Sequence, residues 1–210
     1  MNTSLRAKHN LLKLFGFFLL YYALALPLWL GLKTPYQNVI NTVSFKAAAW
    51  IYDIRLLHSN LQSDGTTVMT ATNDYLSLTL DGRDNRVVFD TQLDIDAITF
   101  NVPMTLALIL AIVTVMKAGK KDRFDAVFNG MILLVILHLL TMFVISLSVI
   151  IATTEQSKAL AFYLQHRWMP KAFLINLGTL LSTYAARFEP FLIAIFVWWW
   201  SNSHKTATKV

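Results

Sequence analysis

Long runs of residues without acidic or basic side chains dominate the pattern of this sequence. Two of these runs, 102–116 and 126–153, flank a short segment, 117–125, that is rich in lysine and arginine. A hydrocarbon core about 30 Å thick needs about 20 helical residues to cross it, so the first run must borrow residues upstream of 102. Because backbone polar groups cannot be left unpaired in lipid, both runs are predicted to be helices. The pattern therefore predicts transmembrane helices at 101–116 and 126–153, joined by a tight loop.

Two further apolar stretches lie nearer the ends of the chain. One, 14–32, follows a basic leader, 1–13, and the other, 173–200, precedes a weakly basic tail, 201–210. The first stretch has a signal peptide as its alternative interpretation, since Ala23-Leu24-Ala25 resembles a cleavage site. Its apolar run is longer than the roughly 7–15 residues of a signal-peptide core, so a retained anchor is predicted. The prediction is therefore four transmembrane helices.

The distribution of charge predicts which way these helices face. Four cations, Lys117, Lys120, Lys121 and Arg123, lie in the loop between the second and third spans. Lysine and arginine near the ends of spans resist translocation, so this loop is predicted to be cytoplasmic and to determine the topology. Both termini are then cytoplasmic, in the inner membrane of a bacterium. The net charge of +6 is explained by these cytoplasmic segments, and no separate patch for nucleic acid remains.

The segment between the first two spans, 33–100, is then exported to the periplasm, and it begins with a helical pattern. Apolar residues of 36–54 recur at a helical period, whereas Asn38, Asn41, Lys46 and Asp53 fall largely elsewhere on the helix. The apolar residues are Val39, Ile40, Val43, Ala47, Trp50, Ile51 and Ile54. The pattern predicts an amphipathic helix that either lies on the outer membrane surface or packs on the domain that follows.

From Arg55 to Phe100 the pattern alternates between apolar and polar residues. Asp64-Gly65, Asn73-Asp74 and Asp81-Gly82 are typical turn sequences. Three to four antiparallel strands in a small meander are predicted, with one apolar face covered by the preceding helix, the membrane or a partner. The predicted fold class is an α-helical integral membrane protein with four transmembrane helices and a small exported helix-plus-antiparallel-β domain between spans 1 and 2. A second exported interfacial amphipathic helix is predicted at 154–172.

Composition adds little catalytic chemistry to this picture. The chain is 56% hydrophobic and has no cysteine, and its mean hydropathy is +0.52. Its five histidines show no metal-ligand spacing, and no nucleotide-binding or hydrolase motif is present. Aspartates from Asp53 to Asp96 do not follow a calcium loop and fit solvated turns better. No catalytic residue, cofactor or metal is predicted, and the chain is predicted not to be an enzyme.

The informative polar residues are those predicted to lie at membrane depth. His138 lies in the third span, and Arg187 and Glu189 lie in the fourth, with Tyr184 one turn before Arg187. Ionisable groups in lipid cost at least about 2.5–3.5 kcal/mol each on insertion scales, so they usually face the helix bundle and pair. Three interpretations of Arg187 and Glu189 stay open: side chains that reach the outer interface, a buried structural pair, or a proton or substrate site.

The order of these parts resembles a known family. An N-terminal span, an exported amphipathic segment and a short β region lead into the junction Asp94-Ile-Asp-Ala-Ile-Thr-Phe-Asn-Val-Pro103-Met-Thr-Leu-Ala-Leu-Ile-Leu-Ala111. This layout is similar to that of the exosortase H-associated membrane proteins, small bacterial inner-membrane proteins found with an exosortase, a membrane transpeptidase-like enzyme. The resemblance implies an accessory role and a membrane-protein partner, with an exosortase as the candidate, and it carries over no catalytic residues.

Two functions of different classes follow. The first is a non-enzymatic inner-membrane accessory or scaffold subunit that docks a partner in an envelope-processing, sorting or secretion system through its exported domain. The alternative is a transporter or ion-coupled subunit that uses Arg187, Glu189 and His138. A third possibility is a membrane enzyme acting on a lipid-linked substrate through Asp94 and Asp96. The expected partners are the lipid bilayer and a membrane protein, an oligomer stays open, and no nucleic acid is expected.

Overall fold

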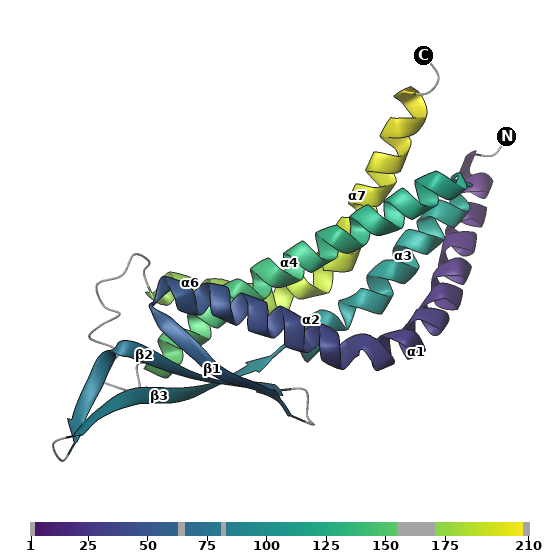
Figure 1. Ribbon diagram of the computed structural model, residues 1–210. Helices are drawn as coiled ribbons and strands as arrows, with labels where there is room; N and C mark the ends of the chain where they lie inside the picture. The colour runs from purple at the N-terminus through teal and green to yellow at the C-terminus, as the bar shows by residue number, and fades with distance from the viewer. Residues whose placement is uncertain (1–2, 63–65, 81–82, 155–170, 208–210) are drawn as a thin grey trace. The chain divides into compact units, whose positions relative to one another are not determined.

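The computed structural model describes residues 3–62, 66–80, 83–154 and 171–207 (Figure 1). The chain divides into two compact units. The first unit comprises Met1–Lys33, Phe100–Leu137 and Arg187–Val210, and the second comprises Thr34–Thr99 and His138–Ala186. Helices α1 (Thr3–Ile51) and α4 (Lys120–Thr154) each contribute one part to either unit.

Among the described residues, two helices are long and apolar enough to cross a membrane, and the chain is therefore a membrane protein. Within α1 the candidate span is Lys8–Ile51, and within α4 it is Lys120–Thr153. At 1.5 Å per residue, the 49 residues of α1 extend about 74 Å, far more than the ~30 Å of hydrocarbon. A third span is present if Ala172–Tyr184 and Arg187–Ser201 form one broken span. Of the four predicted spans, the described residues thus show two or three.

The predicted second span is a short helix. Helix α3 (Asn101–Val115) has 15 residues, which extend about 22 Å and do not reach across a typical hydrocarbon core. It is preceded by the single turn α2 (Asp96–Thr99). The prediction that this run borrows residues upstream agrees with this arrangement, because helical residues continue back to Asp96 with only Phe100 between the two helices.

Helix α1 differs from the prediction in having no break after residue 32. The predicted span 14–32 and the predicted amphipathic helix are parts of one helix that continues through Pro35. Proline lacks an N–H group, so the carbonyls of Ala23 and Gly31, four residues before Pro27 and Pro35, lose their usual helical partners, yet the chain stays helical past both prolines. The boundary between the two units falls beside Pro35, at Lys33 and Thr34.

The basic loop is shorter than predicted because α4 begins at Lys120. Residues 116–119 alone connect it to α3, and Lys117 adopts a left-handed conformation with φ 53°. The N–H of Lys117 donates to Thr114 O at 3.1 Å and that of Ala118 to Val113 O at 3.1 Å. This pair of bonds is a Schellman motif, which satisfies the last carbonyls of α3 and reverses the chain within a few residues.

Three helices of the first unit pack around a glycine. Helix α7 (Ala186–Ala207) turns one buried face inward, and α4 turns an apolar face outward. The inward residues of α7 are Glu189, Ile193, Val197 and Ser201, and the exposed residues of α4 are Phe124, Phe128, Ile132 and Ile136. A Cβ on Gly130 of α4 would lie 2.4 Å from Ile109 Cδ1 of α3 and 3.2 Å from Val197 Cγ2 of α7. The glycine therefore permits α3, α4 and α7 to meet.

The second unit contains the three-stranded antiparallel meander that the alternation predicted. Its strands β1 (Ile54–Leu61), β2 (Thr66–Leu80) and β3 (Arg83–Asp94) are ordered β1-β2-β3. Two of the predicted turn sequences fall between strands, outside the described residues. The third turn prediction, Asn73-Asp74, is wrong, because β2 continues through it and only its register to β3 shifts between Asn73 and Ser77. Such an irregularity accommodates extra residues without ending the strand.

Helices of the same chain cover the inner face of this sheet. Met69 and Ala71 of β2 and Leu93 of β3 are fully or almost fully buried. Asn41 of α1 donates to Thr67 Oγ1 at 2.6 Å, and Thr153 of α4 bonds to Thr91 at 3.2 Å. The helix that precedes the meander, one of the three covers proposed for its apolar face, therefore packs on the sheet, and the end of α4 packs there too. The predicted helix at 154–172 lies almost wholly outside the described residues.

The β2–β3 pair continues past β1. Strand β1 pairs with β2 only as far as Ile54 opposite Asn73, whereas β2 and β3 remain paired to Leu80 opposite Arg83. We name residues 77–80 and 83–86 the β ribbon. Figure 1 shows the β ribbon extending past the Ile54 end of β1.

Candidate functional site

One face of the second half of α1 carries polar side chains that are buried, and we name these residues the polar seam: Tyr36, Gln37, Asn41 and Ser44. Spacings of four and three residues place Gln37, Asn41 and Ser44 on the same side of a helix. Their side chains are 1%, 0% and 2% exposed. Buried amide and hydroxyl groups need hydrogen-bond partners, because leaving them unpaired costs free energy.

The polar seam bonds to three different elements. Gln37 Nε2 donates to Asp96 Oδ1 at 2.5 Å and to Thr99 Oγ1 at 2.9 Å, both on α2. Asn41 bonds to β2, as described above, and Ser44 Oγ donates to the carbonyl of Leu139 on α4 at 3.2 Å. The seam therefore joins the sheet, α2 and the middle of α4 to one helix.

His138 belongs to the same network. It is fully buried, and its Nδ1 lies 2.7 Å from the hydroxyl of Tyr36, whose ring also packs edge-on against the imidazole. Which group donates depends on the tautomer of the histidine. This contact gives His138 a structural role in the second unit.

The opposite face of this part of α1 is apolar and exposed. Val39, Val43 and Trp50 are 59%, 49% and 81% exposed, whereas Asn41 points inward. Asn41 thus lies on a different face from Val39, Val43 and Trp50, and its own face is the one that packs on the sheet. Beside a membrane an outward apolar side chain costs nothing, while an amide gains from partners inside the fold.

In the first unit the buried ionisable group is Glu189. Its side chain is 4% exposed, and its Oε2 accepts a hydrogen bond from Asn101 Nδ2 at 3.2 Å. Asn101 is the first residue of α3, so the carboxyl group lies at a helix N-terminus, where negative charge is favourable. Asn101 was not among the residues predicted from the sequence. The one feature that could have indicated it is the position of its amide side chain, two residues before Pro103 at the start of an apolar run.

Two of the remaining candidates have exposed side chains. Arg187 and Tyr184 are exposed. His138 belongs to the second unit and Glu189 to the first, and each has a partner of its own. His138 and Glu189 thus each make a buried contact within their own unit, and Arg187 and Tyr184 lie at the surface.

The basic and acidic residues singled out in the sequence have local roles. Lys117, Lys120, Lys121 and Arg123 are exposed, and Arg123 Nε donates to the carbonyl of Ala118 at 2.9 Å. Asp94 Oδ1 accepts the backbone N–H of Asp96 at 2.9 Å, which caps α2. Within the described ranges, no group of three or more histidines and acids is placed to hold a metal ion.

No protein-family model matches this chain, and no curated protein or solved structure matches it either. The function must therefore be argued from the chain's own helices, sheet and buried polar groups. What these establish is a membrane protein with two long apolar helices and a small three-stranded antiparallel sheet.

The bond between Asn41 and Thr67 predicts an asymmetry between single and double substitutions. Asn41→Leu is expected to destabilise the protein by about 1–3 kcal/mol, because it leaves the buried Thr67 hydroxyl without that partner. Replacing both residues, as Asn41→Leu with Thr67→Val, is expected to recover part of the loss, because no hydroxyl then remains to be satisfied. Thermal unfolding in mild detergent measures both effects, and a double variant as unstable as the sum of the singles would contradict the prediction.

Proposed function

We propose that this chain is a non-enzymatic accessory or scaffold subunit of a bacterial inner membrane, which docks a partner protein through its exported sheet. The observation that carries the proposal is the β ribbon. Its two strands pair with each other, but β1 pairs with β2 only up to Asn73, so the outer edge of β2 in the ribbon has no strand of this sheet beside it. An edge that no described strand covers presents backbone donors and acceptors with which a strand of another protein can pair.

The way in which the sheet is covered supports the same role. The polar seam and α4 hold its inner face, so the sheet does not need a partner to complete its core. A two-stranded ribbon alone is marginally stable in water, and extending it beyond the covered region gains little for the fold. Docking of a partner strand would explain why the ribbon extends beyond the covered part of the sheet.

For the topology we propose four spans with both termini in the cytoplasm. The exposed cations of the α3–α4 connection support a cytoplasmic loop. A crossing by the short α3 then needs a locally thinned bilayer or residues from α2. Reporter fusions after Ala118 and after Asp81 are expected to be active in the cytoplasm and the periplasm respectively, and the reverse pattern would overturn this arrangement.

For the partner, the resemblance in layout makes an exosortase-type membrane enzyme the first candidate. The chain has no cysteine, so it lacks the thiol nucleophile that such an enzyme would use, and an accessory role is compatible with this. The exposed apolar face of α1 suits the outer surface of the bilayer, where Trp50 would anchor at the level of the headgroups. The sheet would then be held beside the membrane, within reach of a membrane-embedded partner.

Shortening the β ribbon tests the docking role directly. Ser77 and Arg86 are already paired, so residues 78–85 can be replaced by Asn-Gly, a sequence suited to a two-residue hairpin, without altering the pairing of β1. On native gels of gently solubilised membranes, the wild type is expected to migrate as a complex and the shortened variant as the free subunit.

The control changes exposed residues of the same sheet away from the ribbon, His58→Ala with Asn60→Ala. This control is expected to keep the complex. A wild type that is purely monomeric, with no co-purifying protein, or a shortened variant that retains its partner, would refute docking through the ribbon.

The alternative function is a transporter or ion-coupled subunit, and the burial of Glu189 favours it. Loss of cellular function in Glu189→Gln and His138→Ala, with normal insertion and unchanged assembly, would support this alternative. Loss of function only when the complex is lost would support the accessory role.

A further inference from the structure

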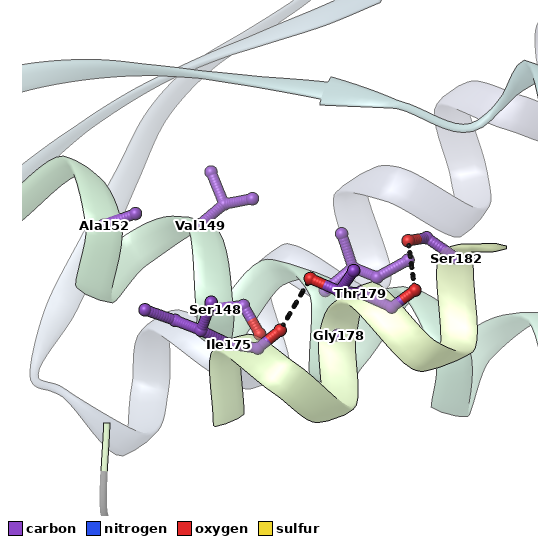
Figure 2. A pocket seen from close by; sticks show the side chains of 8 residues that line it. Ser148, Val149, Ala152, Ile175, Gly178, Thr179 and Ser182 are labelled. Atoms are coloured by element: carbon purple, nitrogen blue, oxygen red, sulfur yellow. Dashed lines mark hydrogen bonds between the residues drawn. The ribbon is translucent and has the colours of Figure 1, made fainter. Parts of the chain in front are cut away.

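The part of α4 that belongs to the second unit and helix α6 (Lys171–Leu180) border a groove with a cavity of about 230 Å³ (Figure 2). Its walls include Ser148, Val149 and Ala152 from α4, with Ile175 and Thr179 from α6 and Ser182 from the helical turn η1 (Leu181–Ala185). Most of these side chains are small, so the groove exists because the residues between the helices do not fill it.

A close contact holds the two helices at a fixed separation. A Cβ on Gly178 would lie 2.5 Å from Ser148 Oγ and 3.1 Å from Ser148 Cβ, so only glycine allows this approach. Ser148 Oγ also lies 2.7 Å from the carbonyl oxygen of Leu174 on α6 and 2.9 Å from that of Val144 on its own helix, and its single proton is shared between these two acceptors. Small residues and hydroxyl bonds of this kind are typical of helix contacts within membranes.

The hydroxyl groups that line the groove are turned towards the backbone. Thr179 Oγ1 donates to the carbonyl of Ile175 at 2.9 Å, and Ser182 Oγ donates to that of Thr179 at 3.1 Å, as the dashed lines in Figure 2 show. Each hydroxyl has a single proton, so with Ser148 all three donors are already used. The groove therefore presents methyl groups, methylene groups and oxygen lone pairs. These surfaces suit an apolar occupant, because the three hydroxyl groups have no proton left to donate to a polar one.

We propose that this groove binds an acyl chain of a membrane lipid. The wall from α4 lies within the candidate span Lys120–Thr153, and α6 is part of the candidate broken span. Phe173 and Leu180 of α6 are 56% and 53% exposed, so the groove continues an apolar surface of a kind that faces lipid. Its volume is below the roughly 300–1,000 Å³ of pockets for drug-sized molecules, which fits one chain rather than a whole lipid. The proposal is independent of the docking role of the ribbon.

The test compares two alanine-to-phenylalanine variants of the full chain. Ala152→Phe fills the groove, while Ala172→Phe adds the same side chain at an exposed position of α6 that does not line it. Each protein is reconstituted with a phospholipid that carries a diazirine in its acyl chain, and labelled peptides are quantified after illumination. The added ring would occupy the space between the helices, so it would exclude the acyl chain sterically. The hydrophobic effect gives no preference here, because the chain is surrounded by hydrocarbon both inside and outside the groove.

Labelling of the peptides that contain 145–152 and 175–182 is therefore expected to be lost in Ala152→Phe, whose ring fills the groove, and to stay unchanged in Ala172→Phe. Native mass spectrometry of the purified proteins distinguishes a retained phospholipid from a free fatty acid. Thr179→Phe fills the groove from the other helix and provides a second variant if the first does not fold. Equal labelling in the wild type and in a folded groove-filling variant would overturn the proposal.

Discussion

Replacing Gly130 by valine is expected to destabilise the first unit by about 1–3 kcal/mol, because the new side chain has no space between α3 and α7. Its Cβ alone would lie 2.4 Å from Ile109 Cδ1 and 3.2 Å from Val197 Cγ2. Ile109 is fully buried and Val197 is 1% exposed, so neither can move aside into solvent or lipid. The free energy of unfolding in mixed micelles measures the effect.

A compensating substitution shows whether this contact is the cause. Valine adds three carbon atoms at position 130, and Ile109→Ala removes three carbon atoms from the neighbouring position. Ile109→Ala alone is expected to cost about 2–5 kcal/mol, because it leaves a cavity. The double variant is expected to be more stable than the sum of the two losses by about 1 kcal/mol or more, as for residues in direct contact.

Gly16 provides the control for this pair. It lies in α1, and a Cβ placed there would meet no atom within 4 Å. Gly16→Val is therefore expected to change stability by no more than about 0.5 kcal/mol, as is usual for substitutions at open surface positions. Additive losses at Gly130 and Ile109, or an equal loss at Gly16, would show that the three helices do not meet as described.

The sheet and the long helices could be predicted from the sequence because each has a repeating pattern of apolar residues. Alternation over tens of residues, interrupted by Asp-Gly pairs, predicted the three strands, and uncharged runs predicted apolar helices. The residues at which these elements begin and end were harder to predict. Charges at 120–123 suggested a loop, but α4 already begins at Lys120, since lysine and arginine are good helix formers as well as topology signals.

The orientation of the second half of α1 could not be predicted from hydrophobicity alone. In water the apolar face of an amphipathic helix turns inward, but the sequence left open whether this helix turns that face towards the membrane or towards the sheet. Next to a membrane the rule loses its force, because lipid or its interface can cover apolar side chains as well as a protein core does. The informative signal was the spacing of Gln37, Asn41 and Ser44, which repeats the helical period and reveals a second, polar face that needs partners.

Contacts between distant segments carried no sequence signal at all. Glu189 and Asn101 are 88 residues apart, and nothing in the sequence around either residue indicates that the other is its partner. Composition indicated that a buried carboxyl group in the last apolar stretch needs a partner, but the identity of that partner follows from packing. The same holds for Tyr36 and His138, 102 residues apart.

Replacing Asn101 by leucine is expected to destabilise the first unit by about 1–3 kcal/mol, because the buried carboxyl group of Glu189 loses this donor. Glu189→Gln keeps an acceptor oxygen at the same place, so the bond from Asn101 can persist and a smaller loss is expected. Thr105 provides the control one turn further along α3. Its buried hydroxyl has no hydrogen-bond partner, so Thr105→Val is expected to be neutral or stabilising.

Thermal unfolding of the three variants in mild detergent ranks these effects, with Asn101→Leu the least stable. If Thr105→Val were as harmful as Asn101→Leu, the loss would reflect general disturbance of α3 rather than the carboxyl group. If Glu189→Gln were the most harmful of the three, the charge of the carboxylate at the helix N-terminus would outweigh its bond to Asn101. The expected order holds only if the amide of Asn101 supplies most of the stabilisation that this buried carboxyl group receives.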